Sequence, residues 1–223
     1  MQRAVRVLFS VAVVVPLVGL LVLAWGDWNR FWIHPARVGA VVVLVLAAAG
    51  RILSLADSPL AWKRRGQRED VGQRFVFLTM IPLTLLLFYL VAYSDSHNWL
   101  VLGGDEVRYI GLLVLCVGLC FRVVPMAILG FRFSGYITVQ KGHTLVTNGL
   151  YRYVRHPNYL GGLLGLLGLV LVFRAGVGLP LLALAAVIFI ARINAEERLL
   201  ASVFGREYED YRRRSWRLVP FVY

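Results

Sequence analysis

The chain has 223 residues, of which 59% are hydrophobic and 16% charged, and its formal net charge is +12. Several apolar runs approach the ~20 residues that a helix needs to cross a bilayer, which excludes an ordinary soluble domain. The basic residues lie between the apolar runs. This pattern favours loops beside anionic lipid headgroups over nucleic-acid binding, so we expect membrane lipids as partners and no nucleic acid.

The amino terminus carries Arg3 and Arg6 before an apolar run that ends at Trp25. This charge pattern is typical of a signal peptide, but the run is too long for one and no small-residue cleavage site follows it. We therefore expect a first spanning helix that is retained.

Six apolar segments predict an all-α fold, a multi-span bundle of about six transmembrane helices. The last two segments are short and predict a helical hairpin, which crosses the membrane either fully or incompletely. We expect one integrated membrane domain over 1–223, with four helices in 1–130 and the hairpin and an amphipathic tail in 131–223. The six segments are 5–25, 38–55, 75–93, 109–129, 159–173 and 177–193.

Lys and Arg are concentrated in alternate loops, which predicts the orientation of the bundle. The segments 57–73, 131–158 and 194–223 are rich in them. The other connections are poor, with Arg30 and Arg37 in one, Arg108 in the next and Arg174 in the last. The positive-inside rule therefore predicts a protein of the cell membrane with both termini and the segment 131–158 in the cytoplasm.

The segment 147–159 is polar, aromatic and basic between two apolar runs. His156 precedes Pro157, and proline is favoured as the first residue of a helix, so we expect His156 near the helix cap. Unpaired N–H groups at such a helix start suit an anion. The residues from Tyr151 to His156 alternate as in an extended strand with two faces. The segment is either the wall of a cofactor site or an interfacial aromatic and basic belt.

Two features inside the apolar segments have alternative interpretations. Gly161, Gly165 and Gly168 form a stripe on one helical face, which favours close packing of two helices and otherwise leaves room for a ligand tail. Arg122 lies in the fourth segment, where it either extends to the interface or faces the bundle interior near a substrate. Cys116 and Cys120 supply neither a paired metal motif nor a disulfide framework, so we expect no metal site from them.

Two carboxylates, Glu196 and Glu197, follow the last apolar segment. We expect them at the end of that helix, where the negative end of the helix dipole makes them unfavourable, and this favours a functional role. Beyond them Leu200, Phe204, Tyr208 and Tyr211 share one helical face, which predicts an amphipathic helix on the membrane surface. This helix is either a lid on a cytoplasmic site or a plain anchor.

Four separate motifs together resemble the isoprenylcysteine carboxyl methyltransferase and phospholipid methyltransferase superfamily of integral membrane enzymes. Their order and spacing make the resemblance specific, and it covers roughly 140–222. The first four helices match only in being hydrophobic. The motifs are Leu145-Val146-Thr147-Asn148-Gly149-Leu150-Tyr151, Arg155-His156-Pro157-Asn158-Tyr159-Leu160-Gly161, Glu196-Glu197, and Phe204-Gly205-x-x-Tyr208-x-x-Tyr211.

The resemblance implies a methyltransferase that uses S-adenosylmethionine at the cytoplasmic face and a lipid-like acceptor from the bilayer. In-line methyl transfer needs orientation of donor and acceptor more than acid–base help. By resemblance we assign the positioning of acceptor and donor, the catalytic role, to Arg155 and Glu196. Arg122 is placed near the substrate on a different ground, as an ionisable group inside an apolar segment. The residues assigned to the cofactor are His143, Gly149, Tyr151, His156, Pro157, Tyr159 and Glu197.

The acceptor stays open, because a prenylcysteine, a phospholipid amine, a small thiol and an isoprenoid acid all suit this superfamily. The oligomeric state is also open. An alternative is an NADPH-dependent membrane reductase of the sterol type, whose C-terminal part carries a similar Arg-His-x-Asn-Tyr block. Pro157, the Glu196-Glu197 pair and the short chain favour the methyltransferase. A membrane protein without enzymatic activity would leave the convergence of the four motifs unexplained.

Overall fold

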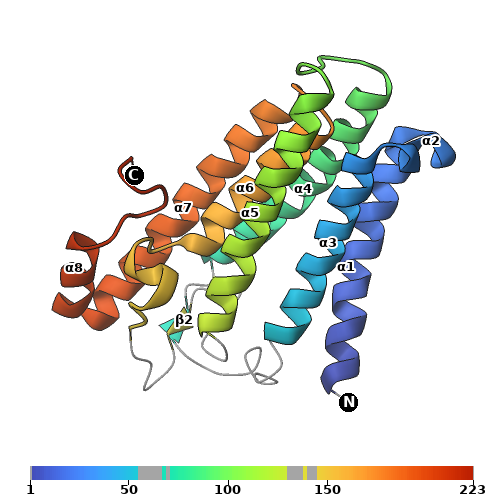
Figure 1. The fold of residues 1–223 in the computed structure, drawn as a ribbon. Helices are drawn as coiled ribbons and strands as arrows, with labels where there is room; N and C mark the ends of the chain where they lie inside the picture. The colour runs from blue at the N-terminus through green and yellow to red at the C-terminus, as the bar shows by residue number, and fades with distance from the viewer. Residues whose placement is uncertain (1, 55–66, 69–70, 130–137, 140–144, 223) are drawn as a thin grey trace.

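The computed structural model describes residues 2–54, 67–68, 71–129, 138–139 and 145–222, and within them the fold is almost entirely helical. Figure 1 shows long helices packed side by side, with the start of α1 and the short α8 toward one end and α2 at the other. The helices are α1 (Gln2–Trp25), α2 (Trp28–Ile33), α3 (Pro35–Ser54), α4 (Val71–Ser96), α5 (Asp105–Leu129), α6 (Pro157–Val172), α7 (Gly178–Phe204) and α8 (Arg206–Arg213).

Short elements complete the fold at the end that carries α8. A 3-10 helix, η2 (Gly149–Arg152), precedes α6, and two short strands, β1 (Gln67–Arg68) and β2 (Thr138–Val139), pair antiparallel. Each of the six apolar segments expected from the sequence is a helix. In the described part of the chain, three of them are long and apolar enough to cross a membrane by length and composition, namely Leu78–Ser96, Asp105–Met126 and Gly178–Phe204. The protein is an integral membrane protein, while the count of six spans stays a prediction.

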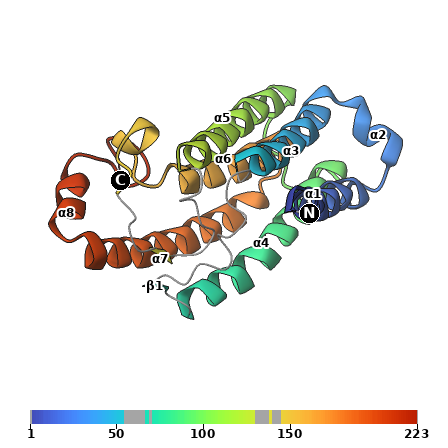
Figure 2. The ribbon, with the colours of Figure 1, turned by 90° about the horizontal axis from the view of Figure 1, so that it is seen from below.

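The glycine stripe of α6 packs directly against α5, which Figures 1 and 2 show alongside it. A methyl group at Gly161 would lie 2.7 Å from the carbonyl oxygen of Gly118, and one at Gly168 would lie 2.5 Å from the backbone nitrogen of Leu115. Such distances are too short for any side chain. The packing interpretation of the stripe is therefore confirmed at Gly161 and Gly168.

The hairpin of α6 and α7 is confirmed, but α7 is longer than the sequence suggested. It continues through Glu196 and Glu197 to Phe204 and ends at Gly205, which has a φ of +51°. The expectation that the two carboxylates end the helix is wrong, because residues 195–204 contain neither glycine nor proline and are mostly good helix formers. Of the four residues expected on one face of the amphipathic helix, Leu200 and Phe204 accordingly belong to α7, and Tyr208 and Tyr211 belong to α8.

A buried carboxylate joins four parts of the fold at the end away from α8. Asp95, near the end of α4, accepts two hydrogen bonds of 2.6 Å from Arg108 of α5. Arg174, in the turn between α6 and α7, donates to the same carboxylate at 3.1 Å, and Arg37 of α3 lies 3.6 Å from it. Arg37 also stacks on Trp25 at 3.9 Å from the ring centre. We call these four residues, Asp95 with Arg37, Arg108 and Arg174, the Asp95 cluster.

Candidate functional site

Pro157 is the first residue of α6 and His156 is its cap, as the sequence predicted. The predicted strand before them is wrong, because 149–152 form the 3-10 helix η2 and only Val154 makes a β-bridge, a parallel one to Trp216. The amide of Arg155 donates to the Trp216 carbonyl at 2.8 Å and that of His156 to the Arg217 carbonyl at 3.2 Å. Figure 2 shows this segment beside the C-terminal tail. The tail therefore fixes the backbone that presents Arg155 and His156.

Glu197 of α7 is the centre of the site. One of its carboxylate oxygens lies 3.0 Å from Nε of Arg155 and 3.3 Å from Nε2 of His156, and the other lies 3.0 Å from the Arg217 guanidinium. The side chains of Glu197, His156 and Arg155 are all at most 9% exposed. Two guanidinium groups therefore face one buried carboxylate, which leaves the surroundings of Glu197 positively charged and suited to a second anion.

Arg155 also ties α8 to the site. Its guanidinium donates to the carbonyl oxygens of Arg212, at 3.1 Å, and of Ser215. Arg155 therefore contacts Glu197 and the tail backbone. The positioning role predicted from the sequence grouped Arg155 with Glu196 instead. The guanidinium fork can hold a carboxylate and carbonyls at the same time because its donors diverge in a fixed plane.

Glu196 belongs to a second, adjoining chain of hydrogen bonds. The Tyr159 hydroxyl donates to Glu196 at 2.8 Å and accepts from Nε of Arg192 at 2.7 Å. The Tyr159 ring packs edge-on against Phe189 at 5.4 Å and against His156 at 5.7 Å. The two carboxylates thus serve different networks.

The remaining predicted site residues lie around these networks. Gly149 begins η2 with a φ of +59°, and Tyr151 is buried there and accepts a hydrogen bond of 2.6 Å on its carbonyl from the Tyr211 hydroxyl. A methyl group at Gly162 would lie 2.9 Å from a guanidinium nitrogen of Arg122, so Arg122 packs on α6 close to Tyr159. His143 lies outside the described residues. The ligand-binding roles of all these residues stay predictions.

Sequence reasoning missed Arg217 and Asn194. The Arg217 guanidinium donates to the Asn194 side chain as well as lying against Glu197. Arg217 lies in a tail without regular structure, and the only signal in the sequence was that this tail contains several arginines. Asn194 is the one amide in the stretch from Arg192 to Glu197, and its polarity inside an apolar helix was the available signal.

Two buried polar atoms at the site have no hydrogen-bond partner among the described residues. They are Oδ1 of Asn158, at the start of α6, and the hydroxyl of Tyr208 in α8. Buried polar atoms are nearly always paired, and the charges of Glu197 and Arg155 act on the Tyr208 hydroxyl, so this hydroxyl favours a place for a polar ligand. A zwitterionic nucleoside ligand needs carboxylates, cationic groups, aromatic surface and further hydrogen-bonding atoms, and the site has all four.

A match to a known protein family concerns this same part of the chain. Residues 110–202 match the model of the isoprenylcysteine carboxyl methyltransferase (ICMT) family. This range contains the predicted site residues from Gly149 to Glu197. Residues 110–202 are thus similar to the isoprenylcysteine carboxyl methyltransferase family.

Two relatives in this superfamily are named protein-S-isoprenylcysteine O-methyltransferases. The one from Dictyostelium discoideum is 30% identical over 63% of this chain and 61% of its own length. The one from Schizosaccharomyces pombe is 37% identical over 48% of this chain and 47% of its own. The chain thus spans about half the length of these relatives. Because the named relatives are methyltransferases, they support the prediction of a methyltransferase and give no support to the reductase alternative.

One solved structure, titled as the eukaryotic intramembrane Ras methyltransferase ICMT without a monobody, aligns with 98% of this chain and 86% of its own. The TM-score is 0.49 and the sequence identity is 17%.

Proposed function

We propose that this protein is an S-adenosylmethionine-dependent methyltransferase of the cell membrane, with its site and both termini in the cytoplasm, that methylates a lipid-like acceptor. The observation that carries the proposal is the convergence of Arg155, His156 and Arg217 on Glu197. This cluster adjoins the bond from Tyr159 to Glu196, and all of these residues except Arg217 lie within the region that matches the methyltransferase family. Two buried polar atoms without partners add capacity for a ligand there.

When bound, S-adenosylmethionine would supply a sulfonium methyl group, which the acceptor atom would attack as the carbon–sulfur bond breaks and its electron pair passes to sulfur. The chain's own residues then have to bind the donor and the acceptor, orient them toward each other and exclude water. The positive surroundings of Glu197 suit a carboxylate, and Glu196 keeps an oxygen beyond its bond to Tyr159 for a hydroxyl or ammonium group. Orientation of this kind accounts for most of the rate that in-line methyl transfer requires.

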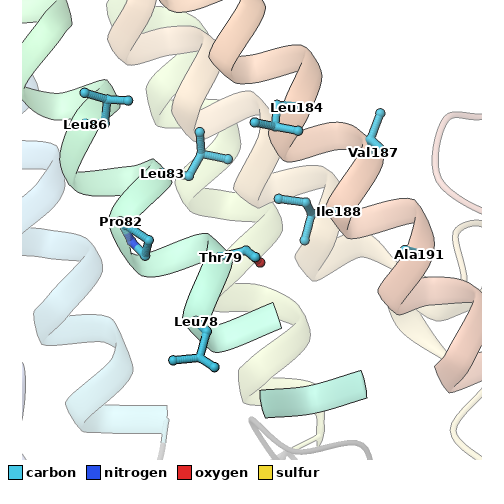
Figure 3. Close-up of a pocket in the computed structure, with 9 residues that line it drawn as sticks. All are labelled: Leu78, Thr79, Pro82, Leu83, Leu86, Leu184, Val187, Ile188 and Ala191. Carbon is cyan, nitrogen blue, oxygen red and sulfur yellow. The ribbon is translucent and has the colours of Figure 1, made fainter. Parts of the chain in front are cut away.

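An apolar groove between α4 and α7 supports a lipid-like acceptor. It has a volume of about 580 Å³, and Figure 3 shows its lining side chains projecting from both helices. The lining is apolar except for one threonine. Of the lining residues on α7, Ala191 is the one nearest in sequence to Glu196. Ala191 precedes Arg192, which bonds Tyr159 in the site. A hydrocarbon chain in this groove would therefore end beside the Tyr159–Glu196 pair. The groove residues are Leu78, Thr79, Pro82, Leu83, Leu86, Leu184, Val187, Ile188 and Ala191.

The names of the relatives favour an oxygen atom as the methyl acceptor. Both relatives described above are called O-methyltransferases of a protein S-isoprenylcysteine. A carboxylate at the polar end of an isoprenoid chain fits a site that combines a lipid groove with guanidinium groups. We infer that such a lipid acid is the acceptor class of this chain.

Filling the groove tests the acceptor. In Ala191→Phe the larger side chain occupies the end of the groove nearest the site, so we expect transfer of a labelled methyl group to an S-isoprenylcysteine or to a membrane lipid extract to fall about tenfold or more, equivalent to about 1.4 kcal/mol. Binding of S-adenosylhomocysteine should not change. The matched control is Leu113→Phe, on an exposed position of α5 outside the groove. Equal transfer by both variants would contradict a lipid chain in the groove.

A further inference from the structure

Tyr208 is buried to 1% exposure, yet its hydroxyl has no hydrogen-bond partner among the described residues. Leaving a buried hydroxyl unpaired costs about 1–3 kcal/mol, and a phenylalanine would fill the same ring volume without that cost. Ring packing therefore explains the aromatic group at this position and leaves the hydroxyl unexplained. Tyr208 also lies beyond residues 110–202, the range that matches the family model.

The charged groups around Tyr208 belong to the proposed donor site. Burial raises the pKa of Tyr208, and the charges of Glu197 and Glu196 raise it further, against the opposite effect of Arg155. The hydroxyl accordingly stays protonated and can donate a hydrogen bond. Glu197 is already engaged by Arg155, His156 and Arg217.

Tyr211 provides a comparison within the same helix. It lies one turn after Tyr208, and the two rings pack edge-on with their centres 6.1 Å apart. The Tyr211 hydroxyl donates to the carbonyl of Tyr151 at 2.6 Å, so it joins α8 to η2. Two buried tyrosines of one short helix thus differ in one respect, since the structure itself satisfies only the second hydroxyl.

We propose that the Tyr208 hydroxyl donates a hydrogen bond to the carboxylate of the bound methyl donor, which makes α8 part of the donor site. This inference rests on the proposed function. The carboxylate is the partner because it is the charged acceptor of that ligand, and hydrogen bonds to a charged acceptor are the stronger ones. Arg155, whose charge acts on Tyr208, and Arg217 both face Glu197, so the surroundings of that carboxylate suit a second anion. In this role α8 is more than a membrane anchor.

The test compares Tyr208→Phe with Tyr211→Phe in the purified full-length protein. Tyr208→Phe removes a hydroxyl that has no partner in the free protein, so its midpoint of thermal unfolding without ligand should equal or exceed that of the wild type. Its affinity for S-adenosylhomocysteine should fall about tenfold, and its affinity for decarboxylated S-adenosylmethionine should match that of the wild type. Tyr211→Phe should lower the midpoint without ligand, because the carbonyl of Tyr151 loses its donor.

Three results would overturn the inference. Unchanged affinity of Tyr208→Phe for S-adenosylhomocysteine would mean that the hydroxyl contacts no ligand. A drop in the ligand-free midpoint equal to that of Tyr211→Phe would mean a structural partner. An equal loss for the decarboxylated compound would rule out the carboxylate. Failure of the wild type itself to bind either compound would instead sink the proposed function, and the two failures are thereby distinguished.

Discussion

Glu197→Gln is expected to weaken binding of S-adenosylmethionine about a hundredfold, equivalent to about 2.7 kcal/mol. The carboxylate organises Arg155, His156 and Arg217, which reach it from the start of α6 and from the tail. The amide has nearly the same shape, but it removes the negative charge and places a donor group against two guanidinium groups. These cations then repel one another and lose the geometry that the ligand needs.

Isothermal titration with S-adenosylhomocysteine measures the effect, and Glu209→Gln is the matched control. Glu209 also pairs with an arginine, Arg212 at 3.0 Å, but the pair is exposed on α8. An exposed ion pair contributes little to stability, so this variant should bind S-adenosylhomocysteine like the wild type. If Glu197→Gln retained the affinity of the wild type, the site would have to lie elsewhere.

Asp95→Asn is expected to give the largest loss of stability among single substitutions discussed for this protein. The carboxylate is fully buried and faces Arg37, Arg108 and Arg174, which come from α3, α5 and the turn between α6 and α7. Its loss leaves three largely buried guanidinium groups without their shared counter-charge. Removing one partner of a buried ion pair costs about 3–5 kcal/mol, and here a single change affects three pairs.

The measurement is the midpoint of thermal unfolding in detergent, with Asp105→Asn as control. Asp105 bonds the same Arg108 at 3.0 Å, but its side chain is 66% exposed. We expect a marked drop for Asp95→Asn and a shift near zero for the control. Equal midpoints for the two variants would show that the Asp95 cluster does not hold these three helices and the turn together.

Much of the fold follows from local sequence patterns. Apolar length predicts the helices, and the sequence His156-Pro157 predicts where α6 begins, because proline fits the first turn of a helix and restricts the residue before it. The glycine spacing from Gly161 to Gly168 indicates the face that meets α5. These features depend on residues near one another in the chain, so periodicity and propensity suffice to find them.

The features that sequence reasoning missed depend on residues far apart in the chain. Arg37, Arg108 and Arg174 look like loop charges when they are counted for orientation, yet all three lie against Asp95. Arg217 meets Glu197 only because the tail returns to pair with Val154 and Arg155. The length of α7 was underestimated because Glu196 and Glu197 were read as a helix end, although their partners, Tyr159 and Arg155, come from another part of the chain.

The network around Glu197 is proposed to belong to a methyl-donor site. The most direct test is thermal unfolding of the purified protein with S-adenosylmethionine, S-adenosylhomocysteine or NADPH at equal concentrations. A ligand that binds only the folded state raises the midpoint, and a concentration of about 100 times Kd adds about 2.7 kcal/mol. We expect a higher midpoint with each of the first two compounds and an unchanged midpoint with NADPH. Stabilisation by NADPH alone would contradict the proposal.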